Sequence, residues 1–333
     1  MKAIVTAPGG LDALKLVDLP DPGKPRPGEI RVALHGSSLN YHDLGVASGR
    51  TATDGRILMA DGAGVVEEVG DGVTEFKPGD RVVSCFFPEW QDGPPLPGGF
   101  SRVPGDGIDG FATEYAVRPA TAFTLAPKGF SHVEAATITT AGLTAWRALV
   151  EIGRLKAGDT VLALGTGGVS IYALQLAKAM GAQVAITSSS DEKLERAKAL
   201  GADFTVNYRT HPEWAGNVLE WTGGRGVDHV VEVGGPGTLG QSIQAARMAG
   251  SITMIGVLTG ARGEVPTAAL AGKQITLSGL IVGSRRQQQD FVRALDTGLF
   301  KPVIDRAFPL EKLADAFRYE MGGGHFGKIG IEW

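Results

Sequence analysis

A glycine-rich turn near the middle of the chain carries the clearest chemical signal. The segment LALGTGGVS, residues 162–170, joins an apolar strand pattern to a helix expected over 170–180. Gly165 permits a tight turn, and Gly167 lets backbone N–H groups at the helix N-terminus approach a pyrophosphate. Ser170 replaces the third glycine of the usual fingerprint, at a position that needs only a small side chain. The turn predicts dinucleotide binding by Gly165, Thr166, Gly167, Gly168 and Val169.

The end of the following strand indicates which dinucleotide binds. An acidic residue about 20 positions beyond the turn would bind the ribose hydroxyls of NAD and repel a 2′-phosphate. This chain has Ser188–Ser190 and then Lys193, and hydroxyls with an ammonium suit a phosphate. We therefore expect NADP(H), with NAD(H) as the alternative that nearby Asp191 favours. The serines also have a purely structural interpretation, because Ser189-x-x-Glu192 fits a helix capping box.

Two patterns of elements surround this turn. From Met1 to about Phe123, short β-rich runs alternate with Pro, Gly and Asp, which predicts a compact antiparallel barrel without helical periodicity. After Ser131, strands alternate with helices, which predicts a doubly wound parallel α/β sheet with a helix over 192–200. Residues 274–283 are expected to form an edge strand of that sheet, and edges invite pairing with a second subunit.

The C-terminal part is expected to return to the first domain. It contains a helix expected over 287–296, another around 313–319, and a final strand in KIGIEW, which needs a sheet edge to pair with. The predicted division is therefore residues 1–130 with 285–333, and residues 131–284.

A long irregular segment from Phe86 to Phe111 combines five aromatic residues with many Pro and Gly. Loops of this length in compact domains are usually functional, which favours a lid or substrate loop over a disordered insertion. Phe87 and Trp90 are expected to line an apolar pocket for a ring-shaped substrate.

Composition excludes several functional classes. The 333 residues carry a formal net charge of −4, which argues against a nucleic-acid or membrane surface and favours a small-molecule substrate. The single cysteine, Cys85, excludes an intrachain disulfide and a four-cysteine zinc site. The opening residues MKAIVTAPGG have no signal-peptide pattern, so we expect a cytoplasmic protein.

These motifs together resemble the medium-chain dehydrogenase/reductase superfamily over essentially the whole chain. The resemblance is carried by GVTEFKPGDRVV, by residues 134–170 around the glycine turn, by SSSDEKLERAKALGAD, by GRGVDHVVEVGG and by HFGKIGI. It implies a GroES-like β-barrel catalytic domain, completed by the C-terminal segment, and a Rossmann domain, with the nicotinamide in the cleft between them.

The positions of the zinc ligands in zinc-dependent members of that superfamily differ here. Where those members carry Cys, His and Cys, this sequence has Asn40, Ala60 and Thr140, which cannot hold a catalytic zinc. No metal is therefore expected. The six histidines show no ligand spacing; they stand at positions 35, 42, 132, 211, 229 and 325.

The chain is most similar to the zinc-independent, quinone-oxidoreductase-like branch, many members of which are labelled alcohol dehydrogenase. Asn40 and Asp43 match the Asn-x-x-Asp of that branch, and Asp61 matches its Gly-x-Asp with Met59 in place of glycine. The resemblance places Asn40 near the nicotinamide and places Lys193 and Tyr208 at the 2′-phosphate. The remaining cofactor residues are expected to be Thr140, Ser188, Ser189, Gly234, Ile255, Val282, Gly283 and Lys328.

The expected reaction is hydride transfer from NADPH to a quinone or an α,β-unsaturated carbonyl, because such acceptors delocalise negative charge without a Lewis acid. Tyr41 and His42 are the candidate proton donors, with local packing as the equal alternative for both. Two other functions stay open: a zinc-free alcohol dehydrogenase, and a non-catalytic NADPH-binding protein. The edge strand and the behaviour of the family favour a homodimer.

Overall fold

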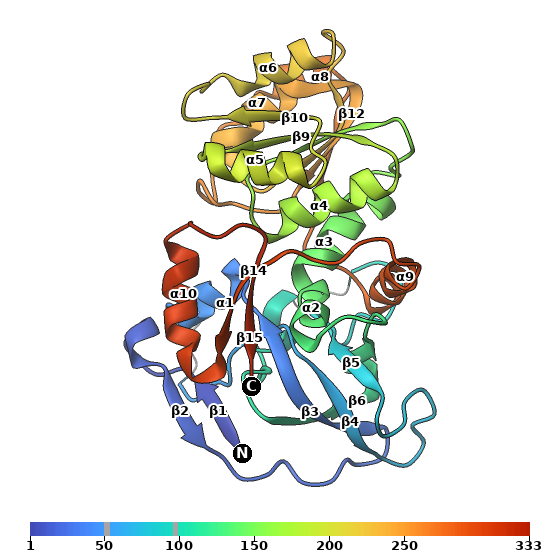
Figure 1. The fold of residues 1–333 in the computed structure, drawn as a ribbon, viewed down its shortest axis with the longest axis vertical. Helices are drawn as coiled ribbons and strands as arrows, with labels where there is room; N and C mark the ends of the chain where they lie inside the picture. The colour runs from blue at the N-terminus through green and yellow to red at the C-terminus, as the bar shows by residue number, and fades with distance from the viewer. Residues whose placement is uncertain (50–53, 96–98) are drawn as a thin grey trace. The chain divides into compact units, whose positions relative to one another are not determined.

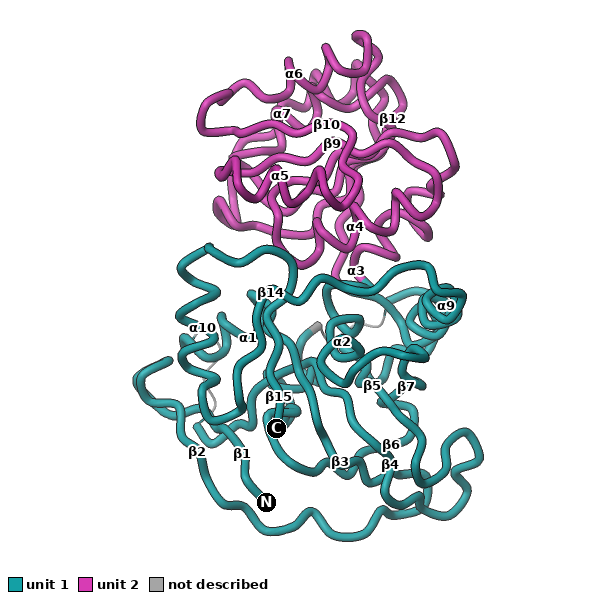
Figure 2. The backbone as a smooth tube through the Cα atoms, viewed as in Figure 1, with its two compact units in different colours: residues 1–143, 282–333 teal, residues 144–281 magenta. Residues whose placement is uncertain are grey.

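The computed structural model describes residues 1–49, 54–95 and 99–333, which divide into two compact units. The first comprises residues 1–143 and 282–333, and the second residues 144–281 (Figure 2). The chain therefore leaves the first unit and re-enters it. None of the helices in the described residues is long and apolar enough to cross a membrane.

The first unit is built on a sheet whose strand order is β14-β15-β3-β4-β5-β7, with β6 also paired to β3 (Figure 1). A separate antiparallel pair is formed by β1 and β2. The strands are β1 (Lys2–Val5), β2 (Lys15–Asp18), β3 (Glu29–Ser38), β4 (Ala63–Val69), β5 (Arg81–Ser84), β6 (Tyr115–Pro119), β7 (Phe123–Leu125), β14 (Ile304–Pro309) and β15 (Lys328–Glu332).

The C-terminal strand joins the N-terminal sheet. β15 pairs antiparallel with β3, with Gly330 opposite Ser38, which confirms the predicted return of the C-terminal segment. The pairs formed among the strands of residues 1–125 are antiparallel, as expected for that part of the chain, whereas β14 pairs with β15 in parallel. Helix α10 (Leu313–Met321) connects these two strands, as parallel neighbours require a crossover.

Helices also occur in the first 123 residues, where the sequence shows no helical periodicity. The expectation of no helix before residue 123 is wrong, because α1 spans Tyr41–Ala47. The described residues of this part also include the short 3₁₀ helices η1 (Gly10–Ala13), η2 (Gly99–Arg102) and η3 (Ala120–Ala122). With two turns or fewer, these helices are too short to display a 3.6-residue period.

Helix α2 (His132–Ala136) decides where the first unit ends. It begins with a capping box formed by Ser131 and Glu134, and it packs against β3, β4 and β15. A π-helical turn, η4 (Ile138–Gly142), and then α3 (Leu143–Trp146) and the π-helix η5 (Arg147–Ile152) follow it. Because of this packing, residues 131–143 lie in the first unit. The predicted boundary at 130/131 instead assigns them to the second unit.

The chain returns to the first unit at residue 282, so residues 282–284 also belong to that unit. The predicted boundary at 284/285 is therefore three residues too far along the chain. Helix α9 (Arg285–Leu295) follows directly, and its first turn is bound to the first unit: Arg285 N donates to Trp90 O at 2.9 Å. A last 3₁₀ helix, η6 (Leu310–Lys312), precedes α10.

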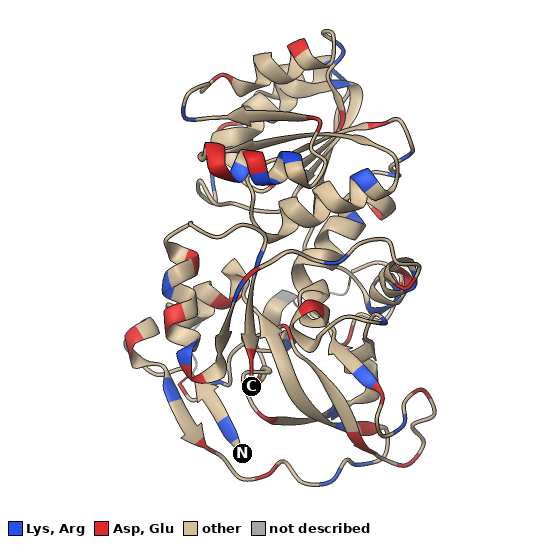
Figure 3. Ribbon diagram, viewed as in Figure 1, with Lys and Arg blue, Asp and Glu red and all other residues tan. Residues whose placement is uncertain are grey.

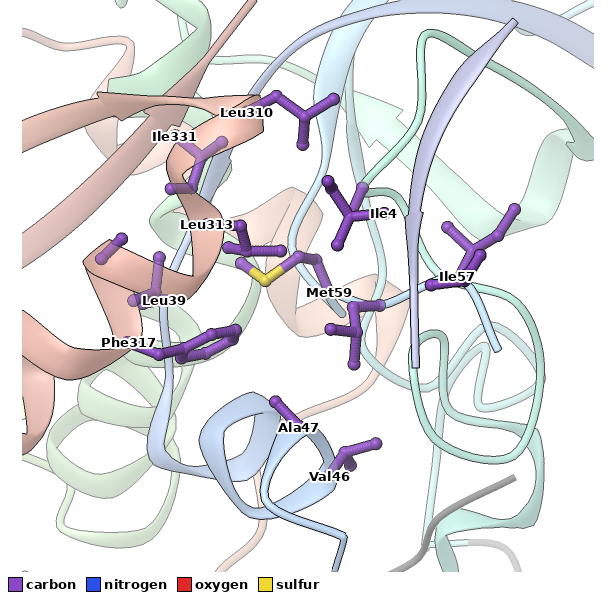
Figure 4. Packing of buried hydrophobic residues seen from close by; sticks show 14 of the residues in the cluster. Ile4, Leu39, Val46, Ala47, Ile57, Met59, Leu310, Leu313, Phe317 and Ile331 are labelled. Carbon is purple, nitrogen blue, oxygen red and sulfur yellow. The ribbon is translucent and has the colours of Figure 1, made fainter. Parts of the chain in front are cut away.

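The core of the first unit includes an unusual residue, Met59. Its backbone has φ of 76°, a left-handed conformation that costs an L-residue about 1–2 kcal/mol. Its side chain is fully buried in a cluster with Ile4, Leu313 and Phe317 (Figure 4), and burying a methionine contributes about 1.5–3 kcal/mol. Packing therefore offsets the backbone strain, and it fixes the chain two residues before Asp61.

The second unit is a six-stranded parallel sheet with strand order β10-β9-β8-β11-β12-β13. Numbered within the unit, this order is 3-2-1-4-5-6, the Rossmann arrangement, whose switch point lies between β8 and β11. The strands are β8 (Thr160–Ala163), β9 (Gln183–Ser188), β10 (Phe204–Asn207), β11 (Val227–Glu232), β12 (Ala246–Met254) and β13 (Thr276–Gly279).

The helices of this unit agree with the predicted alternation and shift its boundaries slightly. They are α4 (Gly168–Ala179), α5 (Asp191–Ala199), α6 (Trp214–Trp221), α7 (Pro236–Ala245) and α8 (Thr267–Gly272). α4 begins two residues before the predicted Ser170. β13 lies at the sheet edge, as expected, but it ends at Gly279, shortly before Val282 turns the backbone to φ of 43°.

Candidate active site

The glycine turn of the second unit has the geometry of a phosphate-binding turn. Gly165 follows β8 with φ of 74°, and its N–H donates to Thr187 Oγ1 at 3.2 Å. Gly167 precedes α4 as its N-cap. A Cβ added at either glycine would meet nothing within 4 Å, and no side chain of the described residues caps this helix. Its first N–H groups are therefore available to an anion.

Ser170 stabilises the turn through a hydrogen bond of its side chain. Its side chain is buried, and its hydroxyl donates to Leu164 O at 2.6 Å. A hydrogen bond thus ties α4 to β8 where the usual fingerprint relies on the small size of glycine. Ser170 is a structural residue of the turn.

The end of β9 brings together several residues predicted to select the cofactor. Ser188 is its last residue and lies 3.5 Å from Thr166, Oγ to Oγ1. Tyr208 N donates to Ser188 O at 3.0 Å, and the Tyr208 side chain is exposed. The adenine-ribose end of a dinucleotide would meet these groups here.

The capping prediction for the serines is wrong by one residue. Ser190, not Ser189, is the N-cap of α5, and its hydroxyl accepts from Lys193 N at 3.4 Å. Ser188 and Ser189 are therefore not the capping residues. The acidic residues of this helix are mixed with basic ones (Figure 3), and the Asp191 carboxylate accepts from Asn207 Nδ2 at 2.7 Å.

Two further predicted cofactor residues follow central strands of the same sheet. Gly234 follows β11 and Ile255 follows β12, so both lie at the carboxyl edge beside the glycine turn. The buried Glu232 carboxylate accepts from the N–H groups of Gly234, at 2.7 Å, and Gly235. Glu232 fixes this loop, and no sequence motif pointed to it.

The other predicted cofactor residues lie in the first unit: Thr140, Val282, Gly283 and Lys328. Val282 is buried and has a left-handed backbone, which is strained for a β-branched residue. Strain of this kind clusters at functional sites. Thr140 and Lys328 belong to a separate network described next.

Asp61 is the centre of a buried hydrogen-bond network in the first unit. Its side chain is fully buried and accepts from Ser38 Oγ at 2.5 Å, Asn40 Nδ2 at 3.0 Å and Thr140 Oγ1 at 2.6 Å. The Lys328 ammonium lies 4.0 Å from the same carboxylate. Four segments far apart in the sequence therefore meet at one carboxyl group.

The amide of Asn40 is held from both ends. Its Nδ2 donates to Asp43 and to Asp61, both at 3.0 Å, and its Oδ1 accepts from Lys328 Nζ at 2.7 Å. Because both amide hydrogens already have carboxylate acceptors, Asn40 has no hydrogen left to donate to a substrate. Its role in this arrangement is to position Asp43, Asp61 and Lys328.

Burial shifts the ionisation of the charged groups in this network. It raises the pKa of Asp61 to about 6, against the opposing effects of Lys328 and the hydroxyl donors. It lowers the pKa of Lys328, whose ammonium also donates to Leu39 O. Glu320 of α10 is buried beside them, and its Oε2 has no hydrogen-bond partner among the residues that the structure describes. Burial raises the pKa of Glu320 to about 7.

The residues at the positions of the zinc ligands in zinc-dependent relatives do not have the chemistry of zinc ligands. They are an amide at Asn40, a methyl group at Ala60 and a hydroxyl at Thr140, and the amide oxygen of Asn40 is bound by an ammonium. Catalytic zinc requires Cys, His or carboxylate ligands. Within the described residues, no group of three or more His, Cys, Asp or Glu side chains could hold a metal ion.

The two candidate proton donors of α1 differ in their surroundings. Tyr41 is exposed. His42 is largely buried, its Nε2 lies 3.1 Å from Asp106 Oδ2, and its Nδ1 lies 3.7 Å from Asp43 Oδ1. Burial opposes protonation of His42, but the two carboxylates outweigh it and raise the pKa. No sequence pattern indicated that Asp106 would lie beside His42.

The long segment after Phe86 is packed against α1. Residues 96–98 of this predicted substrate loop lie outside the described residues. The ring of Phe100 stacks on His42 at 5.3 Å, and Phe87 contacts Trp90 with ring centroids 6.0 Å apart. Trp90 is buried, and its Nε1 donates to Gly93 O at 3.0 Å. Of the two predicted pocket residues, Phe87 is the more accessible.

Comparison with known proteins agrees with this architecture. Residues 26–128 match the family described as alcohol dehydrogenase GroES-like domain, and residues 168–297 match the family described as zinc-binding dehydrogenase. A zinc-type alcohol dehydrogenase-like protein of Schizosaccharomyces pombe (strain 972) is 41% identical over 330 residues, which cover 96% of this chain and 95% of that protein.

Two solved structures show the same fold. An NAD-dependent alcohol dehydrogenase is 37% identical, with a TM-score of 0.90 and complete coverage of both chains. A quinone oxidoreductase from Pseudomonas syringae pv. Tomato DC3000 is 29% identical, with a TM-score of 0.83 and coverage of 100% of this chain and 99% of that one. With its GroES-like unit, its Rossmann unit and these relatives, the chain belongs to the medium-chain dehydrogenase/reductase superfamily of oxidoreductases.

Proposed function

We propose that this oxidoreductase works without zinc and transfers a hydride from NADPH to a quinone or an α,β-unsaturated carbonyl. The observation that carries the proposal is the hydrogen bond from Lys328 Nζ to Asn40 Oδ1. Asn40 stands at the position of a zinc ligand in zinc-dependent relatives, and its amide oxygen is bound by an ammonium instead of a metal ion. Without a Lewis acid, the favoured substrates are those that delocalise the negative charge formed by hydride addition.

The second unit has a site that fits the cofactor. The open backbone at Gly165 and Gly167 and the uncapped start of α4 would hold the pyrophosphate. Ser188, Lys193 and Tyr208 would meet the 2′-phosphate. Bound NADPH would supply the hydride, and residues of the first unit would orient the acceptor and provide the proton.

The names of two relatives, a zinc-type alcohol dehydrogenase-like protein and an NAD-dependent alcohol dehydrogenase, favour a second candidate, an alcohol dehydrogenase that works without zinc. Oxidation of a simple alcohol would have to proceed without metal stabilisation of the alkoxide, so an activated alcohol is the expected substrate for this reading.

Stopped-flow mixing of the NADPH-bound protein with quinones, enones and aldehydes tests the proposal. We expect loss of nicotinamide absorbance with quinones or enones and little with simple aldehydes. The reverse preference would favour the alcohol dehydrogenase, and no loss with any acceptor would leave an NADPH-binding protein without this activity. Stoichiometric zinc in the purified protein would contradict the zinc-free assignment.

Cofactor choice is tested at Lys193. We expect Lys193→Ala to weaken NADPH binding about tenfold or more and NADH binding by less than about twofold, because only NADPH carries the 2′-phosphate. Fluorescence titration with both nucleotides measures the two affinities. Lys198→Ala, on the same helix beyond the first turn, is the control. Equal losses for both nucleotides would favour NAD(H) as the natural cofactor.

We also propose a cytoplasmic homodimer that pairs through the edge strand β13. The apolar side chains of Val257, Leu258 and Ile281 are each about half exposed, and Val257 and Leu258 follow the neighbouring strand β12 while Ile281 follows β13. Exposed apolar groups beside an unpaired edge favour association. Light scattering measures the mass directly, and a monomer at micromolar concentration would contradict this proposal.

A further inference from the structure

Thr140 is the member of the Asp61 network that reaches the surface of the first unit. Asp61 and Lys328 are buried, whereas Thr140 is partly exposed. The hydroxyl of Thr140 donates to Asp61 Oδ1 at 2.6 Å. A molecule on the exposed side of Thr140 would therefore be connected to a buried carboxyl group through one hydroxyl.

Two backbone distortions hold these residues in place. Thr140 lies in the π-helical turn η4, in which Gly142 N donates to Thr137 O at 3.1 Å, five residues back. Met59, two residues before Asp61, has a left-handed backbone. π-turns and strained residues recur at functional sites. Both distortions occur beside the same hydrogen bond.

The charges around Asp61 favour a proton on a carboxyl group of this cluster. Among the described residues, Lys328 from β15 is the one ammonium in a cluster with three buried carboxyl groups, those of Asp61, Asp43 from α1 and Glu320 from α10. If all three were ionised, they and Lys328 would bury a net charge of −2, and a protonated His42, whose Nδ1 lies 3.7 Å from Asp43 Oδ1, would still leave −1. A buried net charge of this kind is costly in a low-dielectric interior. Of these carboxyl groups, Asp61 is the one bound by the hydroxyl of Thr140, a partly exposed residue.

We propose that Asp61 stores a proton and that the Thr140 hydroxyl passes it to the reduced substrate. This inference rests on the proposed reductase function. When Asp61 is protonated on Oδ1, the hydrogen bond between the two groups reverses: Asp61 donates to Thr140 Oγ1, and the Thr140 hydrogen is directed to the substrate. When the hydride adds to an enone or quinone, an enolate or phenolate oxygen forms and takes this Thr140 proton. The Asp61 proton then bonds to Thr140 Oγ1, and Asp61 becomes a carboxylate held by Ser38, Asn40 and Lys328. NADPH is oxidised, the acceptor is reduced, and solvent returns one proton to Asp61.

The test compares Thr140→Val with Thr140→Ser. Positioned proton donors contribute about 10²–10⁴-fold to rate, so we expect Thr140→Val to lower kcat at least 100-fold, with KM for the acceptor and NADPH affinity within about threefold. Thr140→Ser keeps the hydroxyl and should retain kcat within about fivefold. Thr139→Val is the matched control, because Thr139 is the neighbouring threonine of the same turn and donates to Ser84 O instead.

The pH profile separates a relay from a structural role. Asp61 delivers the proton in its acid form, so wild-type kcat should fall as pH rises through its pKa, which burial raises to about 6. Thr140→Val should lose this dependence, and Thr139→Val should keep it. A Thr140→Val enzyme with near wild-type kcat and an unchanged pH profile would overturn the relay.

A measurement without turnover keeps the relay apart from the proposed function. Infrared titration of the carboxylic C=O band, assigned by its loss in Asp61→Asn, should show Asp61 protonated below about pH 6. If wild type reduces no acceptor but this band is present, the proposed function fails while the proton store stands. A band missing at pH 5 would overturn the inference even in an active enzyme.

Discussion

The phosphate turn of the second unit is built from backbone groups, whereas the Asp61 network of the first unit is built from side chains. The turn uses backbone N–H groups and two glycines with open space beside them, from one continuous segment. The network uses side chains from β3, the segment after Met59, η4 and β15. We therefore expect substitutions in the turn to affect ligand binding more than folding, and substitutions in the network to affect folding strongly.

The largest effect on stability is expected for Asp61→Ala. At pH 8, where Asp61 is ionised, the change leaves Lys328 buried without its carboxylate and removes the acceptor of Ser38, Asn40 and Thr140. Breaking a buried ion pair in this way costs about 3–5 kcal/mol. Urea unfolding followed by tryptophan fluorescence measures the loss. A loss below about 1 kcal/mol would mean that the network is solvated and that the comparison above is wrong.

Glu320→Gln should have a smaller effect of opposite sign. The folded pKa of Glu320 is raised from 4.5 to about 7, so its folded carboxyl binds a proton more tightly than the unfolded one, and stability falls as pH rises through this window. Gln carries no charge. The variant should therefore be more stable than wild type by about 2–3 kcal/mol at pH 8 and equally stable at pH 4.

Thermal unfolding of wild type and Glu320→Gln from pH 4 to pH 8 measures both the sign and the size of this stability difference. Glu311→Gln is the control, since Glu311 is exposed and lies just before the same helix. A variant that is less stable than wild type at pH 8 would show that the Glu320 carboxylate stabilises Lys328 more than its burial costs.

The smallest stability effects are expected in the phosphate turn. Gly165 has φ of 74°, so Gly165→Ala should cost about 1–2 kcal/mol. Gly167 has an ordinary φ of −79°, so Gly167→Ala should change stability by less than about 0.5 kcal/mol. Both should weaken NADPH binding at least tenfold, because the added methyl group occupies the space beside the backbone. Calorimetric titration gives the affinities, and wild-type affinity in Gly167→Ala would place the pyrophosphate elsewhere.

Local patterns predicted the second unit well. Its strand and helix alternation, its glycine turn and its edge strand were recognisable because each depends on one continuous segment. Ser170 shows the limit of this approach. Its small size was a reason to accept the fingerprint, but its hydrogen bond to Leu164 O depends on the way α4 packs on β8.

The first unit was harder to predict in detail. Its two-turn helix α1 gave no periodic signal, and the pairing of His42 with Asp106 joins residues 64 positions apart. The position of Asn40 near the nicotinamide stays a prediction, and no sequence pattern indicated that its amide hydrogens would bind Asp43 and Asp61. Lys328 was assigned to the cofactor, and in the folded unit its ammonium binds Asn40.

The sequence by itself determined the superfamily, the Rossmann unit and the residues that differ from zinc ligands, because these are local patterns or single residue types. The tertiary structure decided what replaces the zinc ligands. Asp61 lies 267 positions from Lys328 in the chain, and their separation of 4.0 Å arises from the pairing of β15 with β3. Burial, which depends on the whole fold, then shifts the ionisation of Asp61, Lys328 and Glu320.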